Sequence, residues 1–402
     1  MNLALLANLN TITFSALQIL LFTLLPYLAE AMHVSLSLVV AVFSAGSFLF
    51  LWSSPYWAAK SDTAGRQPIL LAGVLGLGVS TLMLWSLTQW GEKWGATAVV
   101  VVLILSRVIY GLLASAVVPV AQALQVDLSE TSSGSAMKAM ISNSMSLNIG
   151  RSLGPIYVLL SGGQNMDRVL VGFMFWILLL AGINVWALGI KAPQMKTAPA
   201  KEQGFQAWGM AFNQMRWVFL LAVLFTSFIG ILNSSLAVIL KHSFSLSSQD
   251  SGLLMAKLLL VSAVIAVATQ FMGRMFFKNP WQGALVLGVL TLLVGSVLLL
   301  VMNMQSHLWA AIFFLSVGIA LVPPCYLTLM TTVDSVHLGL GRKAGIVSAA
   351  NTIGYAVGGS LAAITLKAQA FSLESLMVFL VLLMMVSIAI LYRQRFSAAV
   401  ET

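Results

Sequence analysis

Charge is scarce in this sequence: only 8% of its 402 residues are charged, whereas 60% are hydrophobic. A soluble protein of this length covers its surface with many more charged side chains than that. The mean hydropathy of +0.99 therefore excludes a soluble domain as the main body of the protein. The composition predicts an integral membrane protein.

Cysteine is almost absent, and the single Cys325 has no second cysteine with which to form an intramolecular disulfide. The four histidines are scattered without metal-ligand spacing, so we expect no metal and no cofactor. Nucleophiles and paired carboxylates do not converge within the apolar segments, which argues against an enzyme. The net charge of +9 comes from basic residues placed singly at segment ends, so we expect no nucleic-acid partner.

Long apolar runs separated by charged breaks fill most of the chain. A helix needs about 20 apolar residues to cross the hydrocarbon core of a bilayer. We expect twelve transmembrane helices, at about 5–29, 36–58, 68–88, 96–124, 138–161, 167–190, 216–240, 250–275, 282–302, 308–332, 343–366 and 373–392. The expected fold is an all-α membrane protein.

The longest polar segment divides these helices into two groups of six. We expect an N-terminal six-helix bundle at 1–190, a cytoplasmic linker at 191–213 and a C-terminal six-helix bundle at 214–402. The aromatic stretch 205–217 is expected to form a short amphipathic helix along the membrane interface. The two bundles should be pseudo-symmetric, because Gly150 to Pro155 resembles the stretch from Gly354 to Gly359, about half a chain away.

Lysine and arginine indicate the orientation in the membrane. With a cytoplasmic amino terminus, thirteen of the 20 basic residues lie in inner loops and the tail, four lie in outer loops and three lie inside spans. The positive-inside rule then places both termini in the cytoplasm. We expect a monomer in a cell membrane, with the bacterial inner membrane as its setting.

A charged stretch between the second and third spans contains Asp62, Gly65 and Arg66. Glycine suits a tight loop there because it adopts positive φ readily. The spacing resembles the loop between helices two and three of the major facilitator superfamily, whose usual pattern is G-x-x-x-D-x-x-G-R-[KR]. Ala58 and Gln67 depart from that pattern at its first glycine and its last basic residue.

Two more motifs are similar to those of the same family. Arg107-x-x-x-Gly111 in the fourth span is similar to its R-x-x-x-G. Gly150-x-x-x-Gly154-Pro155 in the fifth span is similar to the G-x-x-x-G-P core of its antiporter motif, without the closing glycine pair. The resemblance to 12-helix drug and metabolite:proton antiporters implies alternating access, in which two bundles rock about a site near the bilayer midplane.

Two groups of residues are expected to control the conformation. Arg66 should pair with Asp127, and Asp62 should face the start of the eleventh span, which would form a latch; the alternative is a positive-inside loop with a solvated acid. The glycine pairs should let neighbouring helices approach closely, with Pro155 permitting bending. Static packing is the alternative for these small residues, which are Gly111, Gly150, Gly154, Gly354 and Gly358.

Three cations lie inside the expected spans: Arg107, Arg151 and Lys257. Each costs about 2.5–3.5 kcal/mol at the centre of a span, so it should face a cavity or a partner. The eleven acids all fall at or beyond the expected ends of spans. A positive cavity without an acidic partner should prefer an anionic cargo, with Gln18 and Asn148 as candidate hydrogen-bonding residues.

Each cation also has an interpretation that does not involve cargo. Arg107 can hold helices together or assist proton release. Arg151 can reach along the helix to the interface or bind carbonyl groups freed by Pro155, and Lys257 can reach outward past Asp250.

We expect an exporter of a small amphipathic or anionic metabolite, such as a carboxylate siderophore, or of drugs. The alternatives are an importer of an organic anion and a membrane sensor that transports nothing. Glu30 is the candidate for proton coupling, although a solvated interfacial acid fits it as well. An interior-negative membrane potential would also drive an anion outward, with about 2.3 kcal/mol per charge per 100 mV.

Overall fold

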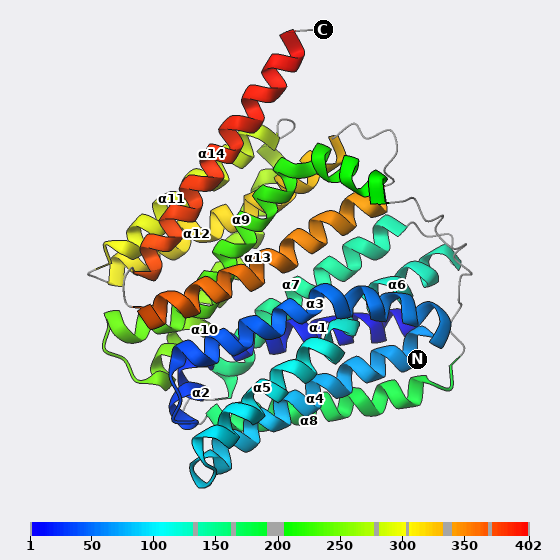
Figure 1. The fold of residues 1–402 in the computed structure, drawn as a ribbon, viewed down its shortest axis with the longest axis vertical. Helices are drawn as coiled ribbons and strands as arrows, with labels where there is room; N and C mark the ends of the chain where they lie inside the picture. The colour runs from blue at the N-terminus through cyan, green and yellow to red at the C-terminus, as the bar shows by residue number, and fades with distance from the viewer. Residues whose placement is uncertain are drawn as a thin grey trace. The chain divides into compact units, whose positions relative to one another are not determined.

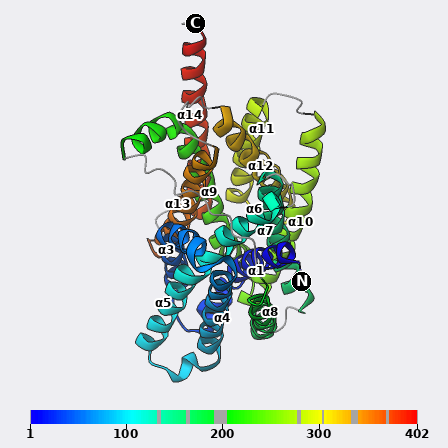
Figure 2. The ribbon, with the colours of Figure 1, turned by 90° about the vertical axis from the view of Figure 1, so that its right-hand side faces the viewer.

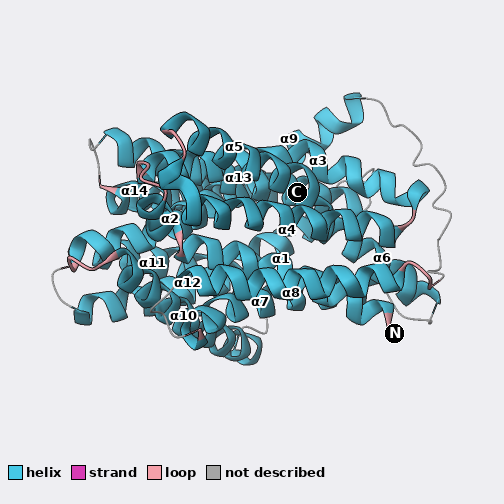
Figure 3. Cartoon of the chain, turned by 90° about the horizontal axis from the view of Figure 1, so that it is seen from below, coloured by secondary structure: helices cyan, strands magenta, loops and turns pink. Residues whose placement is uncertain are grey.

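The fold is taken from a computed structural model of the chain, which describes residues 2–131, 136–161, 166–190, 205–276, 281–302, 305–332, 340–368 and 372–400. These residues form helices joined by short loops, with no strand among them (Figure 3). The all-α prediction is confirmed.

Two groups of helices follow each other along the chain (Figure 1). The first is α1 (Leu3–Thr23), α2 (Leu25–Ala31), α3 (Leu36–Ala64), α4 (Arg66–Trp90), α5 (Ala96–Leu113), α6 (Val117–Thr131), α7 (Ala136–Leu160) and α8 (Met166–Ala187). The second is α9 (Phe205–Ser243), α10 (Ser248–Phe276), α11 (Trp281–Leu300), α12 (Gln305–Thr332), α13 (Leu340–Ala368) and α14 (Leu373–Val400). Each expected span has its counterpart, the first in α1 with α2 and the fourth in α5 with α6.

Local chemistry explains where these helices break or continue. Pro26 lies in the first turn of α2, and because proline lacks an N–H it divides the first span from Leu24 onward. No proline occurs between Phe205 and Ser243, and the structure has one continuous helix there. The stretch 205–217 is helical, as expected, but it is the start of α9 and not a short helix of its own. Its expected position along the membrane interface stays a prediction.

Contacts divide the chain into two compact units. The first unit holds Met1–Ala200 together with Leu240–Lys257, and the second holds Lys201–Ile239 together with Leu258–Thr402. The loop between α9 and α10 thus clusters with the first unit, although it follows the 191–213 segment in the chain.

In the first unit, α1 contacts α6, α7 and α8, while α3, α4 and α5 lie side by side (Figures 1 and 2). Its core includes Ala7, Leu70, Val120 and Leu124 from three of these helices. In the second unit, α11 packs against α12 and α14, and α13 contacts α12 and α14.

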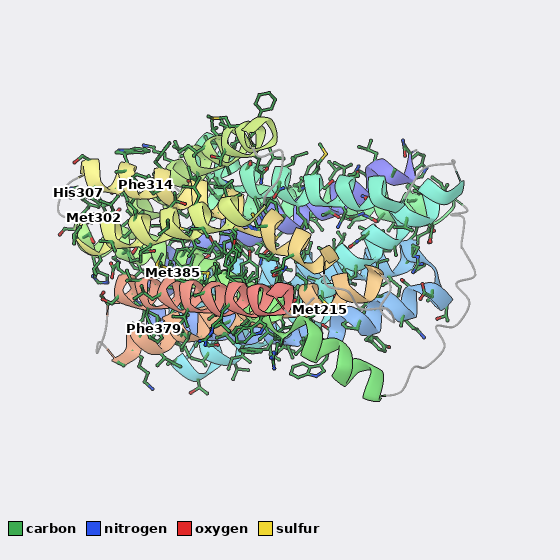
Figure 4. The ribbon with its side chains drawn as sticks, turned by 90° about the horizontal axis from the view of Figure 1, so that it is seen from above. Met215, Met302, His307, Phe314, Phe379 and Met385 are labelled. Carbon is green, nitrogen blue, oxygen red and sulfur yellow. The ribbon has the colours of Figure 1, made fainter. Side chains whose placement is uncertain are left out.

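Eleven helices in the described part of the chain are long and apolar enough to cross a membrane. The protein is therefore a multi-pass membrane protein. Large apolar side chains face outward, as lipid contact requires; Phe379 on α14 is 55% exposed and lies near Met385 on the same helix (Figure 4). The 25-residue helix α7 is not among the eleven, and its sequence is rich in serine and asparagine.

Candidate functional site

The turn between α3 and α4 holds the predicted ion pair. Gly65 adopts a φ of 93°, a conformation that glycine reaches without strain. Directly after it, the Nε of Arg66 donates to the Oδ2 of Asp127 over 2.9 Å. The same guanidinium donates through Nη1 to the Oδ1 of Asp62 and the Oγ of Ser61. The predicted pairing of Arg66 with Asp127 is confirmed, and Asp62 joins the same network.

The predicted contact of Asp62 with the start of the eleventh span lies outside the described side chains, because those at the beginning of α13 are not described. It stays a prediction. So does the role of this network as a latch.

Glycine pairs bring helices into close contact in both units. A Cβ on Gly150 would meet the carbonyl oxygen of Ile12 and the side chain of Ser15, and one on Gly154 would meet the carbonyl oxygen of Ala16. The predicted close approach is confirmed, with α7 lying directly on α1. Pro155 is buried within α7 beside these contacts.

The same contact recurs in the second unit. A Cβ on Gly354 of α13 would meet Thr226 of α9, and one on Gly358 would meet the carbonyl oxygen of Ser227. The repeat expected from the two glycine motifs therefore corresponds to the same helix contact. Gly111 of α5 makes a similar approach to the carbonyl oxygen of Gly46 in α3.

These contacts also show the depth of the candidate residues. Since Gly150 and Gly154 lie beside residues 12–20 of α1, Asn148 and Arg151 lie level with about residues 12–15 of that helix. Gln18 is in α1 itself. The three residues therefore fall within roughly 9 Å along the helix axis, at a rise of 1.5 Å per residue. They form one layer near the middle of α1.

Gln18 lies between two contact strips of α1. Ser15, three residues before it, donates through its hydroxyl to the Leu147 carbonyl of α7. Phe14, four residues before it, stacks on Tyr110 of α5 with ring centroids 6.1 Å apart. Residues three and four apart share a helix face, so Gln18 points between α5 and α7. It is half-buried there.

Asn148 and Arg151 occupy a polar strip of α7. Both side chains are exposed, and Arg151 donates to the Oδ1 of Asn148 over 3.4 Å. The exposed large apolar side chains of α7 are Met145, Ile149, Leu153 and Leu160. Ile149 and Leu153 are each two residues from Arg151. Positions two apart on a helix point in nearly opposite directions. Arg151 is therefore exposed on a different side of α7 from the one that suits lipid.

We call Gln18, Asn148 and Arg151 the polar face of the first unit. The glycine contact places Asn148 and Arg151 at the depth of the part of α1 that carries Gln18. Helix α7 contacts α8 through Tyr157 and Phe173, whose ring centroids are 5.8 Å apart. Around the helix, Tyr157 lies on the opposite side of Gly150 and Gly154 from Arg151. The structure thus places three of the five residues expected to bind cargo at one depth of the first unit, with Arg151 in contact with Asn148.

Arg107 lies on α5, three residues before Tyr110, and is enclosed by its neighbours. It is 3% exposed, and its guanidinium carbon lies 4.4 Å from the ring centroid of Phe43 and 4.8 Å from that of Tyr110. Its Nη2 donates to the Ser80 hydroxyl of α4. The aromatic faces stabilise the buried charge. Arg107 therefore holds α3, α4 and α5 together, which supports the first of its two alternatives.

Lys257 is separate from the polar face. It is exposed on α10, on the same strip as Val264 and Phe271, seven and fourteen residues later, which are 64% and 67% exposed. A strip of this kind is typical of lipid contact, along which a lysine stem can extend to the interface. Among the side chains that the structure describes, no carboxylate contacts Arg107, Arg151 or Lys257.

Glu30 lies at the exposed end of α2 and pairs with Lys241 over 3.7 Å. Lys241 also donates to the Ser248 hydroxyl over 2.6 Å, so it links the two ends of the α9–α10 loop. His33 pairs with Glu92, not with Glu30. This arrangement gives Glu30 a partner without testing its part in proton coupling.

An aromatic cluster around Tyr110 could not be predicted from the sequence. Phe14, Phe50 and Tyr110 come from α1, α3 and α5, with ring centroids 5.4–6.1 Å apart. No spacing along the chain marks these residues, because each comes from a different helix. The described residues hold no group of three His, Cys, Asp or Glu that could bind a metal ion.

Comparison with known families gives one match over most of the chain. The family model described as Major Facilitator Superfamily matches residues 3–363. No curated protein matches the chain.

Solved structures of transporters share the fold. The human organic anion transporter MFSD10 (TETRAN) is 19% identical, with a TM-score of 0.64 over 96% of this chain and 98% of that one. The nucleoside transporter NupG is 11% identical, with a TM-score of 0.71 over 96% and 98%. A bacterial homolog of the human lysosomal transporter Spinster is 15% identical, with a TM-score of 0.66 over 96% and 94%. At these identities the likeness concerns the fold alone.

Proposed function

The chain belongs to the major facilitator superfamily, and we propose that it is a secondary active transporter of a small anionic or amphipathic metabolite. The family is one of transporters, not of enzymes. The observation that carries the anionic cargo is Arg151, which is exposed on the polar strip of α7 with no carboxylate among its described contacts.

The physical reason is the cost of an unpaired charge at this depth. A guanidinium at the centre of a span costs about 2.5–3.5 kcal/mol, and a bound anion offsets that cost by supplying the missing counter-charge. A guanidinium binds carboxylate or phosphate through two parallel hydrogen bonds. Asn148 and Gln18 add neutral hydrogen-bonding groups beside it.

The direction of transport that we favour is export, driven by the membrane potential. An interior-negative potential contributes about 2.3 kcal/mol per negative charge per 100 mV to outward movement. This driving force requires no titrating acid within the spans, and all described acids lie at helix ends. The protein then works in a cell membrane, with both termini in the cytoplasm. The description of MFSD10 as an organic anion transporter agrees with this cargo class.

Transport into proteoliposomes tests the proposal. Uptake of labelled benzoate, citrate and the neutral probe uridine is measured with voltage or a pH gradient imposed separately. We expect voltage-dependent uptake of an anion. A requirement for a pH gradient without any effect of voltage would replace the potential-driven mechanism by proton exchange. Absence of flux for all anions, with flux of uridine, would refute the anionic cargo.

Two variants test whether Arg151 on the polar face, and not Lys257 on α10, binds the anion. Arg151→Gln is expected to lower anion uptake by at least about tenfold, because it removes a charge-assisted hydrogen bond. The matched control is Lys257→Gln, which removes a cation of similar burial and is expected to leave uptake unchanged. Equal losses in the two variants would contradict the assignment of Arg151.

A further inference from the structure

The internal repeat allows the two units to be compared residue by residue. Ser15 of α1 and Thr226 of α9 meet the first glycine of each pair, and Ala16 and Ser227 meet the second. The residue before Ser15 is Phe14, and the residue before Thr226 is Phe225. These two phenylalanines are therefore equivalent.

Each phenylalanine contacts a tyrosine from the fourth helix of its half. Phe14 stacks on Tyr110, with centroids 6.1 Å apart, and Phe225 contacts Tyr326, with centroids 6.0 Å apart. Both tyrosines are buried, at 7% and 3% exposure. The two units thus place the same aromatic pair at the same position relative to the glycine contact.

The hydroxyl groups of these tyrosines differ in their partners. Tyr326 donates to the Oδ1 of Asn351 over 3.2 Å, and Asn351 is three residues before Gly354. The residue three before Gly150 is Leu147, which offers no side-chain acceptor. The Tyr110 hydroxyl accordingly has no hydrogen-bond partner among the residues that the structure describes.

The Tyr110 side chain is buried as a whole, but its hydroxyl oxygen is not fully enclosed, and a tyrosine hydroxyl at such a position can bind a ligand group. Tyr110 borders the polar face, because Gln18 follows its stacking partner Phe14 by four residues. The Arg107 guanidinium lies against the same ring at 4.8 Å, so the surroundings of Tyr110 carry a positive charge. A free donor in such surroundings favours an anionic acceptor.

We propose that the Tyr110 hydroxyl donates a hydrogen bond to an acidic group of the cargo, alongside Arg151. This inference rests on the proposed function and extends it. Tyr110 is then a cargo-contacting residue on α5 that selects carboxylates or phosphates. Arg107, whose guanidinium lies against the Tyr110 ring, is a positioning residue. The equivalent Tyr326 holds α12 to α13 instead.

The test uses equilibrium binding to the purified full-length protein in detergent, with benzoate, citrate, inorganic phosphate and uridine as probes. Tyr110→Phe removes only the hydroxyl and keeps the ring stacked on Phe14. We expect it to weaken binding of the preferred anion about tenfold without changing Tm, since a hydrogen bond to a charged group is lost. The matched control, Tyr326→Phe, should lower Tm and leave the Kd unchanged.

A second variant keeps the Tyr110 hydroxyl but gives it a hydrogen-bond partner within the protein. Leu147→Asn introduces the acceptor found in the second unit, which should engage the Tyr110 hydroxyl and weaken anion binding by a similar factor. An anion Kd within about twofold of wild type in both variants would overturn the role of Tyr110 while leaving the anionic cargo intact. Binding of uridine but of none of the anions by the wild type would instead overturn the proposed function itself.

Discussion

Replacing Asp127 by asparagine tests the buried ion pair that joins α4 to α6. Asp127 and Arg66 have side chains that are 8% and 7% exposed, with 2.9 Å between Oδ2 and Nε. Asp62 contacts the same guanidinium, but its side chain is 46% exposed. The two carboxylates share a partner and differ in burial, which makes Asp62→Asn the control.

The magnitudes follow from that difference. Removing one partner of a buried ion pair costs about 3–5 kcal/mol, because the other charge stays buried without compensation. Asp62 still faces Arg66 in the Asp127→Asn variant, so we expect about 3 kcal/mol, the lower end of that range. An exposed pair contributes about 0–1 kcal/mol after screening by solvent. Asp62→Asn should thus have a much smaller effect.

Thermal unfolding of both variants in one detergent gives the comparison, with wild type in parallel at low and high salt. We expect a clear fall in Tm for Asp127→Asn at both salt concentrations. For Asp62→Asn we expect a small change that high salt abolishes, since salt screens exposed charges more than buried ones. A larger loss of stability in Asp62→Asn than in Asp127→Asn would refute the reasoning from burial.

Two further predictions concern packing and the α9–α10 loop. Gly154→Val places a side chain against the Ala16 carbonyl and should destabilise the protein by about 1–3 kcal/mol. In the control, Gly182→Ala, the added Cβ meets nothing within 4 Å, so the change should be neutral or stabilising by up to about 1 kcal/mol. The Tm of each variant is measured, and equal effects would contradict the close contact. Glu30→Gln should leave Tm unchanged because its pair with Lys241 is exposed; if it also abolishes pH-dependent uptake, Glu30 takes part in proton coupling.

The helices could be predicted from sequence because their signals are local. Apolar runs and charged breaks delimit the spans. Each expected span has a counterpart among the helices, although the ends differ by several residues and α9 begins earlier than expected. The ion pair of Arg66 with Asp127 could be predicted because opposite charges fall at the start of the third expected span and the end of the fourth. In both cases the information lies in the order of residues along the chain.

The candidate site could be predicted only in part, because it depends on how each helix is rotated. Arg107, Arg151 and Lys257 look alike in sequence, since each is a cation within an apolar run. Their surroundings differ: aromatic rings enclose Arg107, a polar strip carries Arg151, and Lys257 shares a strip with exposed apolar side chains. These differences come from contacts between helices that are distant in the chain.

The two halves show that the charge of the polar face is not needed to build the fold. Tyr355 follows Gly354 where Arg151 follows Gly150, and Ile229 follows Phe225 by four residues where Gln18 follows Phe14. The close glycine contact forms in both units regardless of these differences. Because the second unit builds the same contact without a cation, the free energy of placing Arg151 at this depth is not offset by helix packing. Under the proposed function, a bound anion would offset this free energy.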